Sequence, residues 1–139
     1  MNAVVDTSVL LRLLLPGDPR QVAAVESCIR ASERGEPTLV VAPTTLSEIT
    51  HVLRGPRLAL GRAKTADAVR FLRALPLRFL DDDVIDHAVA LYDAAHDDWD
   101  DCMVAAYSLL RADGKLLAYD RDFDRIPGIT RFEPPLVTL

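Results

Sequence analysis

The sequence has little cysteine and no long hydrophobic run. Its 139 residues include two cysteines, Cys28 and Cys102, with no CxxC pair or Cys/His cluster of the kind that binds zinc. No apolar stretch approaches the roughly 18 residues that a transmembrane helix needs. The first residues also lack the basic segment that opens a secretory signal. We therefore expect a cytoplasmic protein whose two cysteines are small core residues.

Basic residues are in the minority. Lys and Arg number 16 against 21 Asp and Glu, which gives a net charge of −5. This balance argues at first against a nucleic-acid partner, because affinity for phosphates comes from Lys and Arg. However, 14 of the 16 basic residues are Arg, whose planar fork suits phosphate. The composition is therefore compatible with a metal-dependent nuclease but does not argue for one.

The length and the apolar content favour one folded domain over residues 1–139. Half of the residues are hydrophobic, which disfavours intrinsic disorder. A chain of this size typically forms a single domain and buries roughly 68% of the surface that it exposes when unfolded.

Short apolar segments alternate with amphipathic ones along the chain. This alternation predicts an α/β fold with a parallel sheet and right-handed crossovers. We expect a cap at Thr44 or Thr45 for the third helix and Asp18 as the cap of the second. The predicted strands are 2–6, 38–42, 78–80, 116–119 and 130–133. The third helix is expected to run from its cap to Gly55-Pro56, and the other predicted helices are 7–14, 19–34, 62–75, 84–95 and 101–112.

Four acidic residues stand at the ends of strands or early in helices. They are Asp6, Glu48, Asp101 and Asp120. In a parallel α/β sheet, strand C-termini and helix N-termini meet at one edge, where sites form. Four carboxylates at that edge would repel one another unless cations neutralised them, and hard cations prefer oxygen ligands. The pattern therefore favours a divalent metal site.

Four stretches that contain these acids carry a family resemblance, and they occur in the same order and with similar spacing over nearly the whole chain. The chain resembles PIN-domain ribonucleases and, more narrowly, the VapC toxins of bacterial toxin–antitoxin pairs. The stretches are Val4-Val5-Asp6-Thr7-Ser8, Leu46-Ser47-Glu48-Ile49, Asp101-Cys102-Met103-Val104-Ala105-Ala106 and Leu117-Ala118-Tyr119-Asp120-Arg121-Asp122-Phe123.

The resemblance implies a three-layer α/β/α sandwich around a central parallel sheet of four or five strands. It places the first strand beside the strand that ends at Asp120. It also implies an endoribonuclease that hydrolyses RNA phosphodiester bonds with Mg²⁺ or Mn²⁺. Asp6, Glu48, Asp101 and Asp120 would be its catalytic residues, with Asp6, Asp101 and Asp120 as metal ligands. The implied partners are RNA, a cognate antitoxin and a second copy of the chain, without a membrane.

Other polar residues near these acids are candidates for supporting roles. Thr7 and Ser8 could bind a metal-bound water or a phosphate, or could cap a helix. Asp122 could assist Asp120, and Arg121 and Arg125 could contact phosphate, although a solvated surface position also fits both arginines.

Two of the four principal acids also have a simpler interpretation, and the other two each have a neighbouring acid as an alternative. Asp6 could cap the helix that follows it, and Glu48 could be a solvated helix residue. The acidic turn before the helix 101–112 leaves Asp100 as an alternative to Asp101, because acids favour a helix N-terminus in any case. In the same way, Asp122 is an alternative to Asp120.

Three other functions remain open from the sequence. The first is a PIN-like RNA-processing nuclease without a toxin role, and the second is another Mg²⁺-dependent phosphoryl-transfer enzyme. A phosphatase with an aspartate nucleophile would want Asp-x-Asp after its first strand, and this chain has Ser8 at the third position. The third is a degenerate PIN module that only binds protein, against which the presence of all four acids argues.

Overall fold

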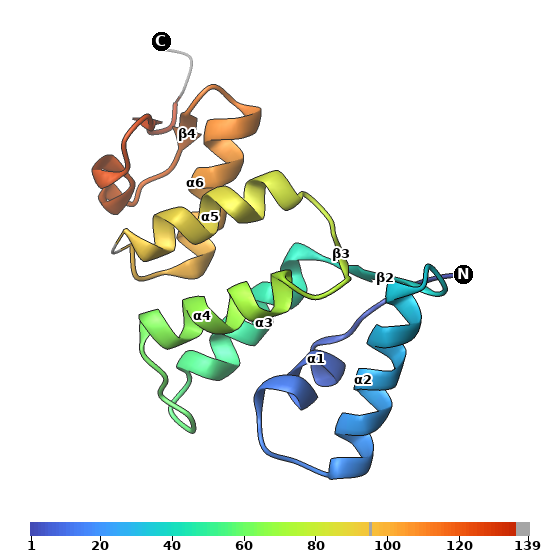
Figure 1. Ribbon diagram of the computed structural model, residues 1–139. Helices are drawn as coiled ribbons and strands as arrows, with labels where there is room; N and C mark the ends of the chain where they lie inside the picture. The colour runs from blue at the N-terminus through green and yellow to red at the C-terminus, as the bar shows by residue number, and fades with distance from the viewer. Residues whose placement is uncertain (95, 136–139) are drawn as a thin grey trace. The chain divides into compact units, whose positions relative to one another are not determined.

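The computed structural model describes residues 1–94 and 96–135 (Figure 1). The chain divides into two compact units. The N-terminal unit is Met1–Asp81, and the C-terminal unit begins at Asp82. Each unit carries two of the four principal acids.

A three-stranded parallel sheet organises the N-terminal unit. Its strands β1 (Asn2–Val4), β2 (Thr38–Val41) and β3 (Arg78–Phe79) lie in the order β1-β2-β3. Ala3 is opposite Leu39, and Val40 is opposite Arg78. The Val5 N–H donates to the Val40 carbonyl at 2.8 Å, so the ladder continues almost to Asp6.

Four helices complete this unit: α1 (Thr7–Leu14), α2 (Pro19–Glu33), α3 (Pro43–Arg54) and α4 (Arg62–Arg73). The predicted start of α2 is confirmed, because the Asp18 side chain accepts from the Arg20 N–H at 2.9 Å and Pro19 is the first helical residue. The predicted cap of α3 is wrong. Its N-cap is Ala42, without a side-chain cap bond, and the helix begins at Pro43. Proline suits this position because its missing N–H would have no helical partner there.

The predicted core position of Cys28 is also wrong, whereas that of Cys102 is confirmed. Cys28 is exposed on α2, and Cys102 is fully buried. The reason lies in α2 as a whole, since none of its residues is buried. By contrast, α3 turns Leu46, Ile49 and Leu53 fully into the core. The helical spacing in α2 identified its apolar side but not how completely that side is covered.

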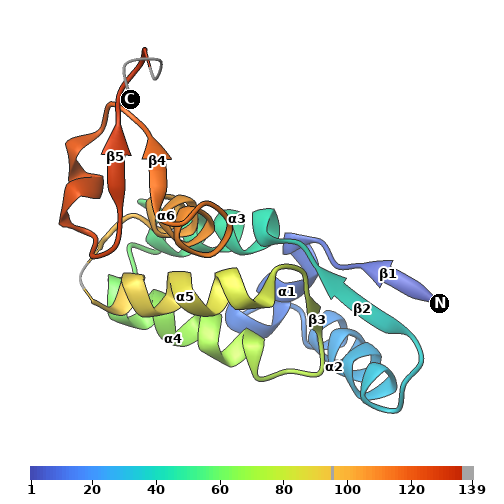
Figure 2. The ribbon, with the colours of Figure 1, turned by 90° about the horizontal axis from the view of Figure 1, so that it is seen from above.

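The described part of the C-terminal unit contains two packed helices and a two-stranded parallel sheet. These elements are α5 (Asp82–Asp93), α6 (Trp99–Arg111), β4 (Lys115–Leu117), the 3₁₀-helix η1 (Arg121–Arg125) and β5 (Thr130–Phe132). Figure 2 shows β4 and β5 side by side. The sequence did not predict η1, and the predicted end of α5 at residue 95 lies outside the described residues.

A small core holds η1 against α6. Ala105 of α6, Phe123 of η1 and Ile126 are buried together, and Leu109 and Leu116 pack against them. Phe123 is therefore a core residue, at 6% exposed. This packing fixes the segment that follows Asp120.

The expected single sheet of four or five strands is not what the described residues form. They form a three-stranded and a two-stranded sheet, in which β1 pairs with β2 and β4 pairs with β5. The parallel α/β character is confirmed, but the strand count within one sheet is not. The strands are two to four residues long, so each ladder has few hydrogen bonds. No helix within residues 1–94 and 96–135 is long and apolar enough to cross a membrane.

Candidate active site

Asp6 follows β1 and caps α1. Its Oδ2 accepts from the Ser8 N–H at 3.1 Å and from the Ser8 Oγ at 2.6 Å. These two bonds, led by the one from the Ser8 hydroxyl, hold the pKa of Asp6 below its usual value. The capping interpretation is therefore correct, and it accounts for Ser8. Both bonds fall on one carboxylate oxygen, so capping is compatible with a second role for the exposed Asp6 carboxylate.

Glu48 lies on α3 and is joined to α1 through Thr7. The Thr7 Oγ1 donates to the Glu48 Oε2 at 2.7 Å. Thr7 is only 4% exposed, whereas Glu48 is exposed. The Thr7 hydroxyl therefore orients Glu48. This role differs from the two expected for Thr7, which were binding a metal-bound water or a phosphate and capping a helix. In the N-terminal unit, Ser8 thus holds the Asp6 carboxylate, and Thr7 holds the Glu48 carboxylate.

Asp101 is the third residue of α6, which begins two residues earlier than predicted. The helix is capped by Asp98, whose Oδ1 accepts from the Asp101 N–H at 3.0 Å. Asp101 is half-buried. Burial is the first cause that raises its pKa, followed by the negative charges of Asp98, Asp120, Asp100 and Asp122. The fold therefore concentrates negative charge around Asp101.

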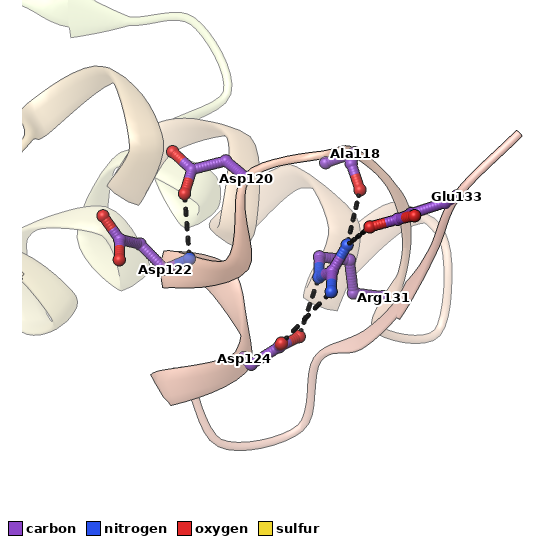
Figure 3. A network of polar contacts seen from close by, with 6 residues as sticks. All are labelled: Ala118, Asp120, Asp122, Asp124, Arg131 and Glu133. Carbon is purple, nitrogen blue, oxygen red and sulfur yellow. Dashed lines mark hydrogen bonds and ion pairs between the residues drawn. The ribbon is translucent and has the colours of Figure 1, made fainter.

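Asp120 follows β4 and caps η1. Its Oδ1 accepts from the Asp122 N–H at 2.9 Å (Figure 3). Asp120 and Asp122 are both exposed, and both charges act on Asp101, the larger effect coming from Asp120. The C-terminal unit therefore brings Asp101, Asp120 and Asp122 into one electrostatic neighbourhood. This finding leaves both alternatives, Asp100 or Asp101 and Asp120 or Asp122, open as ligand choices.

A cavity of about 220 Å³ lies beside two of these acids. Arg125 is at this cavity, and its Nη2 is 4.0 Å from the Asp122 Oδ1. Arg121 is exposed on the same 3₁₀-helix. The lining consists of His96, Asp97, Asp98, Asp101, Asp122, Phe123, Arg125 and Ile126. The candidate phosphate contacts therefore lie on the element that Asp120 caps.

A polar network that the sequence did not reveal links η1 to β5. Arg131 of β5 donates to Asp124 of η1, to Glu133 and to the Ala118 carbonyl (Figure 3). These partners are 2–13 residues away along the chain. No local motif encodes such a network.

The donor set suits a hard divalent cation, because it consists of carboxylate oxygens, the ligands that Mg²⁺ and Mn²⁺ prefer. The pKa of Asp101 is raised first by burial and then by four neighbouring carboxylates, whose negative charge a bound cation would offset. Within residues 1–94 and 96–135, no three His, Cys, Asp or Glu side chains are placed to hold one ion.

Comparison with protein families matches residues 3–129 to the PIN domain. The match includes all four principal acids, η1 and most of both units. No curated protein sequence matches the chain.

Proposed function

Because the family match covers most of its length, this chain belongs to the PIN-domain family, and we propose that it is a metal-dependent endoribonuclease. PIN domains are generally metal-dependent nucleases. The observation that best supports this function for the present chain is the charge around Asp101, whose pKa is raised by burial and by four neighbouring carboxylates. Such crowding is unfavourable for folding, and it is characteristic of a site that works with a bound cation.

The proposal requires the acids of both units to act together. We propose that β1 and β4 pair in the working enzyme, which would give one five-stranded sheet with helices on both faces. The family resemblance supports this pairing, because it implies a first strand beside the strand that ends at Asp120. The pairing would bring Asp6 towards Asp120 at the carboxyl edge of the sheet.

In this site, Asp6, Asp101 and Asp120 would hold Mg²⁺ or Mn²⁺, and Glu48 would complete the acidic set. When bound, such an ion supplies an activated water and stabilises charge on the leaving oxygen. The chain's own residues would orient the acidic side chains. The Thr7 Oγ1, for example, donates to the Glu48 Oε2 at 2.7 Å. Arg125, at the cavity beside Asp101 and Asp122, would bind a phosphate of the RNA.

The toxin role is a further part of the proposal. It rests on the resemblance to VapC proteins, which implies a homodimer, a cytoplasmic location and a cognate antitoxin. The N-terminal unit also has an apolar cavity of about 280 Å³ that reaches Asp6 and includes Val9, Val25 and Ile29. A protein partner with an apolar segment and a nearby Arg could fill this cavity and pair with the Asp6 carboxylate.

RNA cleavage tests the enzymatic part. Purified protein should cleave single-stranded RNA with Mg²⁺ or Mn²⁺ and stop when EDTA is added. Asp101→Asn should abolish cleavage, whereas Asp100→Asn should be mild and serves as the matched control on the same helical turn. Cleavage that persists undiminished in EDTA, from protein free of contaminating nuclease, would refute the metal mechanism.

Growth tests the toxin part separately. Expression of the chain in bacteria should arrest growth, and Asp6→Asn should relieve the arrest. Co-expression of a small protein encoded beside this one should restore growth to cells that carry the wild-type chain. Arrest that survives Asp6→Asn would show that the toxicity does not come from this site.

A further inference from the structure

We propose that Arg131 is a positioning residue for Asp120, acting through the backbone that carries it. This inference rests on the proposed function, because it assigns Arg131 to the metal site described above. Arg131 touches neither Asp120 nor Asp122 in the structure (Figure 3). Its effect must therefore pass through the elements that flank Asp120.

Every nitrogen of the Arg131 guanidinium is engaged. Its Nε donates to the Asp124 Oδ1 at 2.9 Å, and its Nη2 donates to the Asp124 Oδ2 at 3.3 Å. Its Nη1 donates to the Ala118 carbonyl at 2.9 Å and to the Glu133 Oε1 at 2.7 Å. The two bonds to Asp124 form the bidentate pair that only an arginine can make.

These contacts bridge the two ends of the segment that holds Asp120. Ala118 lies just past β4, two residues before Asp120, and Asp124 lies in η1, four residues after it. The Ala118 N–H also donates to the Phe132 carbonyl at 2.9 Å, which secures the same point from its other side. Arg131 therefore fixes the spacing between the end of β4 and η1, the spacing that sets where the Asp120 carboxylate lies.

The same contacts argue against Arg131 as a phosphate ligand. Its side chain is 12% exposed, and two carboxylates already neutralise its charge. The Asp124 bond is also strong enough to hold the pKa of Asp124 below its usual value. A residue that bound RNA would need a free face of the guanidinium. Arg125, which is 78% exposed, is better suited to that task.

Arg111 provides a matched control in the same unit. It forms a second two-bond pair, with Asp83 of α5, at 2.9 Å and 3.0 Å. It stands at the C-terminal end of α6, at the opposite end of that helix from Asp101. Arg111→Gln thus removes another two-bond ion pair, at a position outside the segment from Ala118 to Asp124, where the arginine side chain is 47% exposed against 12% for Arg131.

The experiment compares Arg131→Gln with Arg111→Gln in the full chain. Mn²⁺ affinity is measured by calorimetry, the Mg²⁺ dependence of cleavage gives kcat and the KM for RNA, and amide exchange reports the Asp122 N–H. We expect Arg131→Gln to lower Mn²⁺ affinity by about 10- to 100-fold, as loss of a partner that orients a ligand does. Exchange at the Asp122 amide should accelerate, and the KM for RNA at saturating Mg²⁺ should stay within about twofold. Arg111→Gln should change none of these.

A second variant keeps the test valid if Arg131→Gln folds poorly. Asp124→Asn removes the charge from the bidentate pair but keeps Arg131, and it should give a smaller loss of Mn²⁺ affinity. An unchanged Mn²⁺ affinity in a folded Arg131→Gln protein, or a raised KM for RNA with normal metal affinity, would overturn the inference. Wild-type protein that neither binds Mn²⁺ nor cleaves RNA would refute the proposed function itself and the inference with it.

Discussion

Replacing Thr7 with valine tests whether the Thr7 hydroxyl orients Glu48. Thr7 is 4% exposed, and its hydroxyl makes a 2.7 Å bond to the Glu48 carboxylate. Valine has nearly the same shape, so Thr7→Val deletes this bond without opening a cavity. A hydrogen bond to a charged acceptor contributes about 1.5–3 kcal/mol. Because Glu48 is exposed and regains water when it is released, we expect the low end of that range.

The expected loss in the free energy of unfolding is therefore about 1.5 kcal/mol. For a chain of 139 residues, that corresponds to a fall in Tm of roughly 5 °C. Glu48 would also lose its fixed orientation, and we expect RNA cleavage to fall by about 10- to 100-fold, as when a ligand loses its orienting partner. Urea unfolding followed by circular dichroism measures the first effect, and initial cleavage rates measure the second.

Thr7→Ser is the matched control, because it keeps the hydroxyl and removes a methyl group. Loss of one buried methyl costs about 0.8 kcal/mol, so both variants are destabilised. Only Thr7→Val breaks the contact with Glu48, and only it should lose activity. Equal activity in the two variants would refute the conclusion that Thr7 acts by orienting Glu48.

Three further changes test the C-terminal unit. Asp101→Asn should stabilise metal-free protein near neutral pH. The pKa of Asp101 is raised in the folded protein, so the wild type loses stability as pH rises above the usual aspartate pKa, and the variant does not. Urea unfolding in EDTA at several pH values measures the difference in stability, and a difference that does not vary with pH would contradict this reasoning. Gly114→Ala should lower the free energy of unfolding by about 2 kcal/mol, because Gly114 has φ +76° and an added Cβ would overlap the Gly128 carbonyl oxygen. A thermal unfolding curve like that of the wild type would show that the turn relaxes to admit the methyl group. Asp124→Asn should destabilise the protein at pH values above the usual aspartate pKa. The difference in stability from the wild type should vanish as pH falls through the lowered pKa of Asp124, because protonation then removes the charged Arg131 pair from the wild type as well. A difference that persists in acid would show that the loss of this ion pair is not its cause.

Local patterns predicted most of the elements. The helix expected at 7–14 is α1 residue for residue, and α2 begins at its predicted cap and proline. These features depend on residues close in sequence, such as the side chain of Asp18 and the apolar spacing of the helices. The missed cap of α3 shows the limit of this reasoning, because threonines inside the first turn resemble a cap.

Features that depend on distant residues could not be predicted in this way. Nothing in the segment 121–125 distinguishes a 3₁₀-helix from a loop until Phe123 is seen in a core with Ala105 and Ile126. The contacts of Arg131 likewise appear only once β5 lies beside β4. The exposure of Cys28 reflects how little of α2 is covered, which its own sequence does not encode.

For the candidate site, the sequence identified the acids but not all of their immediate partners. Asp6 and Asp120 each cap the element that follows, as the Asp-Thr-Ser and Asp-Arg-Asp patterns permit. The crowding of charge around Asp101 required the fold, because Asp120 and Asp122 come from a different element of the C-terminal unit. Whether the acids of both units share one ion remains a prediction.

Mn²⁺ binding to charge-removal variants from the two units tests this central prediction most directly. Calorimetry would compare wild-type protein, Asp6→Asn from the N-terminal unit, Asp101→Asn from the C-terminal unit and the double variant. If the two carboxylates bind the same ion, either single change should weaken the same binding event, and the double variant should lose far less than the sum of the two losses. Losses that add fully, or an Asp6→Asn variant with wild-type affinity for Mn²⁺, would contradict a site shared by the two units.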